Sequence, residues 1–208
     1  MVGSDCSVGK KYTALALTKS LDALGVHTTF RATGQTGIMI AGNGIPIDAV
    51  VSDFVSGAAE CISPANEANH WDVIEGQGSL FNPSYAGVSL GLLHGSQPDA
   101  FVVCHDATRL VIDSCPQVPI PSIEECIHLH RLCGKQTNPA IRCVGISVNT
   151  SALPADESRR YLKNLSDSTG LPCVDSVRDG CDHIARYLLE SSDAETDQQF
   201  GGRGSVHA

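Results

Sequence analysis

The sequence has 208 residues, of which 42% are hydrophobic and 18% are charged, and its net charge is −9. This length and balance predict one soluble globular domain with a substantial core. The acidic charge without a basic cluster argues against nucleic-acid binding, and the apolar runs are too short to span a membrane. No leader-like segment opens the sequence, and its nine cysteines include no C-x-x-C pair. We therefore expect a cytoplasmic protein with reduced thiols.

Helical and strand patterns alternate along the chain, as periodicity and turn residues indicate. The predicted helices cover residues 10–24, 47–61, 85–94, 122–133, 155–168 and 182–189. The predicted strands cover residues 28–32, 71–74, 99–104, 142–148 and 173–174, and 33–37 is expected to be a loop without helix. From Ser191 the Ser/Asp/Glu/Gln/Gly-rich composition predicts a disordered tail over 191–208, which leaves one domain over 1–190. Such alternation predicts a three-layer α/β domain with a mostly parallel sheet.

A glycine-bounded loop from Gly3 to Gly9 leads directly into Lys10 and the first helix. Backbone N–H groups, the helix N-terminus and a lysine ammonium together form a cradle for phosphate. The spacing departs from the usual P-loop, because five residues separate the glycines and Lys11 stands where a Mg²⁺-binding Ser or Thr is usual. The nearest hydroxyl that could replace this Ser or Thr belongs to Thr13. The alternative is that Thr13 is an ordinary helix threonine without a role in binding. The residues expected to bind the phosphates are Gly3, Ser4, Ser7, Val8, Gly9, Lys10, Lys11 and Thr13.

Six polar loops follow real or inferred strands, and parallel strands bring such loops to one edge of the sheet. These loops cover residues 3–9, 33–37, 75–84, 105–109, 149–151 and 176–180. Three residues in them are catalytic candidates. Glu75 ends a buried strand, where it could hold Mg²⁺-bound water or act as the base that deprotonates an amine. The alternative is a glutamate at a strand end with no functional role. Asp5 could orient Mg²⁺, act as a base or cap the helix, and His105 could form an acid/base pair with Asp106.

The same loops contain candidates for binding an acceptor and a cofactor. Arg31 and Arg109 lie near strand ends, where a guanidinium can clamp a carboxylate in a bidentate manner, although each could be a surface arginine. The predicted substrate-binding residues are Gln35, Thr36, Arg31, Arg109, Ser84 and Tyr85. Asn149 is a further candidate for cofactor binding, and Thr13 and Glu75 are the candidates for holding a metal ion.

Four segments together resemble the P-loop family that includes D-glutamate N-acetyltransferase, over residues 3–189. They are Gly3-Ser4-Asp5-x-x-Val8-Gly9-Lys10, Thr33-Gly34-Gln35-Thr36-Gly37, Trp71 to Tyr85, and Val148-Asn149-Thr150-Ser151. The resemblance implies a P-loop NTPase-like domain that transfers acetyl from acetyl-CoA to the amine of a small amino acid such as D-glutamate. The cradle would then bind the phosphates of coenzyme A. We hypothesise that the base is Glu75 or Asp5. Backbone N–H groups near 76–79 or 34–37 would then donate hydrogen bonds to the oxyanion.

Two alternatives stay open on the sequence. The loop and the Glu75-Gly76-Gln77-Gly78 turn are also similar, more distantly, to dethiobiotin synthetase, which implies an enzyme that uses ATP and Mg²⁺ to activate a carboxylate. The other alternative is a non-catalytic nucleotide-binding remnant. Members of the resembling family carry an N-terminal α/β domain and a strand before the loop, which we expect this chain to lack. We therefore expect a fragment or a truncated product, with an exposed apolar surface that favours a homo-oligomer.

Overall fold

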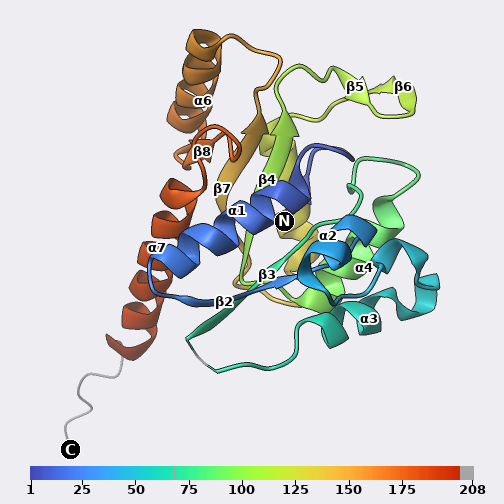
Figure 1. Cartoon of the computed structure of the whole chain (residues 1–208), viewed down its shortest axis with the longest axis vertical. Coiled ribbons are helices and arrows are strands. Elements are labelled where there is room, and N and C mark those ends of the chain that lie inside the picture. Colours follow the sequence, from blue (N-terminus) through green and yellow to red (C-terminus); the bar gives the residue numbers. More distant parts are fainter. Residues whose placement is uncertain (68, 202–208) are drawn as a thin grey trace, which may run out of the picture.

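The computed structural model describes residues 1–67 and 69–201, the last nine of these as backbone only. Its helices are α1 (Lys10–Ala23), α2 (Gln35–Ala41), α3 (Val55–Ile62), α4 (Ala86–Ser96), α5 (Ile123–Gly134), α6 (Ala155–Thr169) and α7 (Asp182–Gly201), with 3-10 turns η1 (Ile47–Ala49) and η2 (Ser52–Phe54). Its strands are β1 (Val2–Gly3), β2 (His27–Arg31), β3 (His70–Ile74), β4 (Ala100–Asp106), β5 (Val111–Ile112), β6 (Cys115–Pro119), β7 (Arg142–Asn149) and β8 (Cys173–Val174). The elements alternate as the sequence predicts (Figure 1).

The strands form two parallel sheets and one hairpin. One sheet has the order β1-β4-β7-β8, and the other pairs β2 with β3. The short antiparallel hairpin β5–β6 stands away from the sheets (Figure 1). The β1 strand links the sheets, because it pairs with β4 and the amino group of Met1 donates a hydrogen bond of 2.8 Å to the Ile74 carbonyl on β3. The α/β fold class with a mostly parallel sheet is thereby confirmed.

Two apolar clusters cover the two faces of the β4–β7 sheet. In β4, Val102 packs with α1 and α7 on one face, whereas Phe101 and Val103 pack with α5 on the other. This alternation is the two-residue periodicity of a strand buried on both faces. A third cluster joins η1, α3 and α4. The result is a three-layer arrangement in which loops at the carboxyl ends of β1, β3 and β4 lie near one another.

Several local predictions differ from the structure. The loop expected over 33–37 starts helix α2, and the helix expected over 47–61 is broken because Val50 adopts an extended conformation. The strand expected to be missing before the loop is present as the two-residue β1. The α7 helix continues to Gly201, where 191–201 were expected to be disordered, because the packed residues Ile184 and Leu188 support its first turns and propagation costs little thereafter. Residues 202–208 lie outside the described part of the chain.

Candidate functional site

The loop between β1 and α1 has the backbone shape of an anion-binding nest. Ser7 and Gly9 both have left-handed conformations, with φ of 55° and 99°. Left-handed residues in such a turn direct neighbouring N–H groups toward a common point, where they can bind an anion. Gly9 is also the N-cap of α1 and has no side-chain capping bond, so Asp5 does not cap this helix as one sequence hypothesis suggested. Free N–H groups at this helix start are therefore available to a ligand.

Lys10 points back into this loop and is only 7% exposed. Its Nζ donates a hydrogen bond of 2.8 Å to the Asp5 carbonyl, and burial lowers the pKa of the ammonium. Close packing depends on Gly3, since a Cβ there would lie 2.9 Å from Val8 Cγ2 and 3.1 Å from Lys10 Nζ. A buried cation at a helix N-terminus is unfavourable alone and becomes favourable when an anion joins it.

Asp5 lies beneath the loop and holds its shape. Its fully buried carboxylate accepts hydrogen bonds from Cys6 N–H, the Asn82 amide, Arg109 Nη1 and Asp113 N–H, at 2.7, 3.1, 2.8 and 2.6 Å. Burial by itself would raise the pKa of Asp5, but these hydrogen bonds outweigh it and lower the pKa. Arg109 also donates to the Cys6 carbonyl at 2.7 Å. The structure thus uses Asp5 and Arg109 to brace the loop.

An open cavity of about 590 Å³ adjoins the nest, within the range usual for small-molecule sites. Four segments line it: residues 6–12 from the nest and α1, residues 34–36 from the start of α2, residues 75–78 after β3, and residues 113–114 from the β5–β6 hairpin. Asp48, Tyr85 and Val88 complete the wall. Cys6 also borders this cavity, and burial raises the pKa of its thiol, which disfavours a thiolate nucleophile there.

Glu75 joins the second and third of these segments. Its Oε2 accepts hydrogen bonds of 3.0 Å from the N–H groups of both Thr33 and Gly34, and the residue is 3% exposed. The Thr33 hydroxyl donates to the Glu75 carbonyl at 2.7 Å. Gly37 must be small, because a Cβ there would lie 2.1 Å from Glu75 Oε2. Glu75 therefore anchors the start of α2 and also faces the cavity.

Some of the other predicted residues reach this cavity. Lys11, Gln35, Thr36 and Tyr85 line it, and Ser7, Val8 and Gly9 contribute from the nest. Ser84 lies in a turn that Asn82 orders, since Asn82 Oδ1 accepts the Ser84 N–H at 3.0 Å. Ser84 itself is exposed on that turn and is not among the cavity-lining residues.

Four predicted residues are engaged elsewhere. The Thr13 hydroxyl is fully buried against Ser147 and Ser176, with Oγ–Oγ distances of 2.8 and 3.2 Å. His105 Nδ1 lies 2.9 Å from Ser4 Oγ, and burial lowers its pKa. Asn149 donates to Asp106 Oδ2 at 2.9 Å, and Arg31 pairs with Asp72 at 2.7 Å across β2 and β3. The loop 176–180 contacts α1 through Ser176, and residues of this loop and of the loop 149–151 are not among those that line the cavity.

The described residues contain no group of three or more His, Cys, Asp or Glu side chains suited to a metal ion. Of the predicted metal pair, Thr13 has its hydroxyl bonded to Ser147 and Ser176, whereas Glu75 uses Oε2 to hold the N–H groups of Thr33 and Gly34. Within the described part of the chain, no helix has the length and apolar character needed to cross a bilayer. The nine cysteines are free.

Asp113 and Ser114 are site residues that the sequence reasoning did not single out. They form the tip of the β5–β6 hairpin, with Ser114 at φ 61°. The hairpin folds onto the loop through the bond from Asp113 N–H to Asp5. The sequence signal for this hairpin is weak, because the apolar pair Val111-Ile112 is short and two prolines interrupt the second strand, Cys115–Pro119.

Gly76 offers a test of how tightly the site is packed. A Cβ on Gly76 would lie 1.9 Å from the Met1 carbonyl oxygen and 2.9 Å from Lys10 Cδ. We expect Gly76→Ala to lower the unfolding free energy by about 1–3 kcal/mol, because backbone must move to admit the methyl group. Gly87→Ala is the matched control, since no atom beyond the neighbouring backbone of its own helix lies within 4 Å of its Cβ position, and α4 should gain a little stability there. Equal effects of the two changes in urea unfolding would contradict this packing.

Comparisons with known proteins agree with this architecture. The family model described as a domain of unknown function, the DUF1611 C-terminal P-loop domain, matches residues 1–185. Proteins named D-glutamate N-acetyltransferase from Pseudoalteromonas sp. and Tritonibacter scottomollicae are 52% and 49% identical to the chain over 187 residues. These matches cover 90% of the chain and 56% of each relative, so the chain spans a little over half of their length.

A solved structure extends the comparison to three dimensions. The crystal structure of a DUF1611 family protein from Anabaena variabilis superposes with a TM-score of 0.85 at 35% identity. That match covers 91% of this chain and 56% of the other. On the family match over residues 1–185 and this shared fold, the chain belongs to the DUF1611 family and consists mainly of its P-loop domain.

Proposed function

We propose that this chain carries the acetyl-donor site of an N-acetyltransferase, which transfers acetyl from acetyl-CoA to the amine of a small amino acid such as D-glutamate. The supporting observation is the nest of residues 4–9 with buried Lys10, opening onto a cavity of about 590 Å³. Two relatives at about 50% identity are named for this activity. A phosphate cradle recognises anionic oxygens and not the base attached to them, so it suits coenzyme A as well as a nucleotide.

Acyl transfer to an amine requires a base, because a protonated amine has no free electron pair to attack the acetyl carbonyl. Of the three catalytic candidates, Glu75 alone borders the cavity. Asp5 uses both carboxylate oxygens in bracing the loop, and His105 is held against Ser4. We assign the base to Glu75 within this proposal, with N–H groups of the adjoining 76–78 turn as candidate donors to the oxyanion.

Glu75→Gln tests the base and separates it from the anchoring role. Glutamine keeps an oxygen that can accept from Thr33 and Gly34, so the loop should persist, whereas it cannot take a proton from an amine. We expect kcat to fall at least about 100-fold, in line with general base catalysis, while the affinity for acetyl-CoA changes little. An unchanged kcat and pH profile would show that Glu75 only anchors α2.

One observation bears on the ATP- and Mg²⁺-dependent alternative. The hydroxyl proposed to replace the missing Ser or Thr belongs to Thr13, and it is already bonded to Ser147 and Ser176. Calorimetric titration with CoA, acetyl-CoA and ATP, each with and without Mg²⁺, distinguishes the alternatives. Binding of CoA that does not depend on Mg²⁺ supports the acetyltransferase proposal. Tight ATP binding that requires Mg²⁺ would contradict it, and binding of none of them would favour a non-catalytic remnant.

A further inference from the structure

Coenzyme A carries two separate anionic groups, and the nest accounts for one of them. Its pyrophosphate is attached to the 5′ carbon of the ribose, and a phosphate monoester, with a charge of about −1.5 to −2 near neutral pH, is attached to the 3′ carbon. In the proposed function the nest and Lys10 bind the pyrophosphate. The 3′-phosphate then requires a second cation, because a charged group that leaves water without a partner loses much of its hydration free energy.

The cavity beside the nest contains one further cation. Among the described residues that line it, Lys10 and Lys11 alone have positively charged side chains. Lys11 is half-buried, and it has no hydrogen-bond or ion-pair partner within residues 1–67 and 69–201. A lysine in the wall of a cavity without a counter-ion attracts an anionic ligand.

Helix geometry suits the two lysines to two different anions. Both belong to the first turn of α1, where successive residues point about 100° apart around the helix axis and do not face each other. Lys10 turns back into the loop and donates to the Asp5 carbonyl at 2.8 Å, so Lys11 leaves the helix in another direction. Two phosphates on the 5′ and 3′ carbons of one ribose are two such anions held close together.

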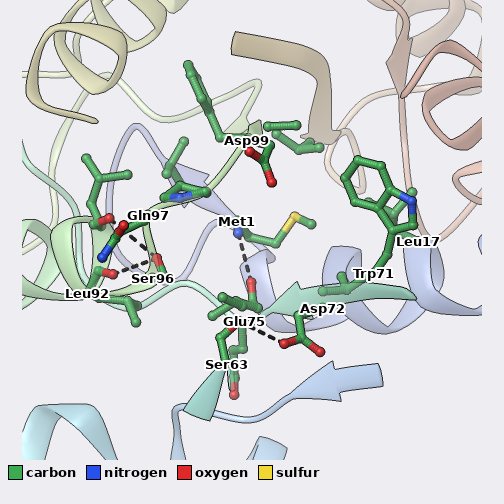
Figure 2. A pocket seen from close by; sticks show the side chains of 18 of the residues that line it. Met1, Leu17, Ser63, Trp71, Asp72, Glu75, Leu92, Ser96, Gln97 and Asp99 are labelled. Atoms are coloured by element: carbon green, nitrogen blue, oxygen red, sulfur yellow. Dashed lines mark hydrogen bonds between the residues drawn. The ribbon is translucent and has the colours of Figure 1, made fainter. Parts of the chain in front are cut away.

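The remaining charged side chains around the cavities are unsuited to a second phosphate. In the cavity beside the nest they are the carboxylates of Asp48, Glu75 and Asp113, which repel an anion. A second cavity, of about 290 Å³, has neither lysine nor arginine among the described residues that line it. Figure 2 shows Asp72 and Asp99 among the side chains that line this second cavity. Lys11 is therefore the suitable partner for the 3′-phosphate.

An aromatic ring lies next to Lys11 in the sequence. Tyr12 lines the same cavity, and 47% of its surface is exposed. Nucleic-acid bases stack on exposed aromatic side chains, and such stacking does not depend on which base is present. The adenine of coenzyme A is attached to the ribose that carries both phosphates, so a ring beside the two lysines is well placed to stack on it.

We propose that Lys11 and Tyr12 form the subsite for the 3′-phosphoadenosine end of coenzyme A, an assignment that rests on the proposed function. The Lys11 ammonium pairs with the 3′-phosphate, and the Tyr12 ring stacks on the adenine. Lys11 is then a specificity-determining residue, because ATP has no 3′-phosphate. A lysine at the position where a P-loop usually has a Mg²⁺-binding Ser or Thr thus supplies a cation for a second phosphate.

Calorimetric titration with CoA and with dephospho-CoA, which lacks the 3′-phosphate, tests the role of Lys11. We expect the unchanged chain to bind CoA about tenfold more tightly than dephospho-CoA, as a hydrogen bond between charged groups predicts. In Lys11→Met the two affinities should come within about twofold of each other, because only CoA loses a partner. Lys19→Met, at an exposed position of the same helix, should keep the tenfold ratio. Lys10→Met should weaken both ligands by a similar factor, since both carry the pyrophosphate.

The same titration tests the stacking on Tyr12. Tyr12→Ala should weaken the binding of CoA and of dephospho-CoA about tenfold, because both contain adenine. The affinity for 4′-phosphopantetheine, which has no adenosine, should stay within about twofold. Tyr12→Phe keeps the ring and should retain the affinity for CoA. Equal losses for CoA and for 4′-phosphopantetheine in Tyr12→Ala would show that the ring does not hold the adenine.

Three other results would overturn the role of Lys11. Equal affinities of the unchanged chain for CoA and dephospho-CoA would do so and leave the proposed function standing, and this comparison depends on no variant. Loss of both ligands by the same factor in Lys11→Met would show that the two lysines share the pyrophosphate. Binding of neither ligand to the unchanged chain would contradict the proposed function and the subsite together.

Discussion

Lys10→Met is expected to weaken the binding of CoA about tenfold to a hundredfold in calorimetric titration. A hydrogen bond between charged groups contributes about 1.5–3 kcal/mol, and 1.4 kcal/mol corresponds to a factor of ten. Lys10 is suited to this role because its ammonium is buried beside the nest and donates a hydrogen bond to an uncharged group, the Asp5 carbonyl. The effect should be larger at low ionic strength, since screening weakens the attraction between lysine and phosphate.

The matched control for this change is Lys19→Met, which removes a charge from an exposed position of the same helix. Its affinity for CoA should stay within about twofold, because solvent and salt screen a charge so placed. Unfolding free energies of both variants should remain within about 1 kcal/mol of the unchanged chain, since methionine retains the aliphatic stem of lysine. Equal losses of affinity in the two variants, or none in either, would show that the nest does not bind the phosphates through Lys10.

Asp5→Asn is expected to lower the unfolding free energy by about 3–5 kcal/mol near neutral pH. The change removes the negative charge that faces Arg109. It also places the NH₂ group of asparagine against N–H donors whose hydrogen bonds the carboxylate accepts in the unchanged chain. The control is Asp156→Asn on α6, because Asp156 also pairs with an arginine, Arg159, but is 87% exposed there. An exposed pair of this kind contributes about 0–1 kcal/mol.

The stability difference between Asp5→Asn and the unchanged chain should also depend on pH. The folded-state pKa of Asp5 is lowered below its ordinary value of 3.8. The carboxylate therefore contributes its full stability above the unfolded pKa and loses it as pH falls through the folded pKa. The difference between the two proteins in urea unfolding should be constant from pH 6 to pH 5 and shrink below about pH 4. A difference that stays constant down to pH 2 would mean that Asp5 contributes through its shape and not its charge.

Local sequence determined the elements whose stabilising contacts lie nearby in the chain. The capping box of α5 is an example, since Ser122 and Glu125 bond to each other's backbone only three residues apart, as predicted. The apolar run of β4 predicted a buried strand, and the glycines before Lys10 predicted a turn into a helix. In each case backbone geometry and side-chain periodicity carry the information, so a short window of sequence suffices.

Tertiary structure decided which of the predicted polar residues share a site. The helix α2 begins where the Glu75 carboxylate, about 40 residues away, accepts two N–H groups that a local pattern would leave unpaired. Asp5 accepts hydrogen bonds from Asn82 and Asp113, which lie 77 and 108 residues away in the sequence. The hydroxyls of Thr13 and Ser147, 134 residues apart, are also hydrogen-bonded. Hydrogen bonds over such separations depend on how the strands are ordered in the sheet and on how the hairpin folds back. The sequence by itself thus determined the cradle and its lysine, whereas the packing of distant segments determined that Asp5 and Arg109 brace it and that Glu75 faces the cavity beside it.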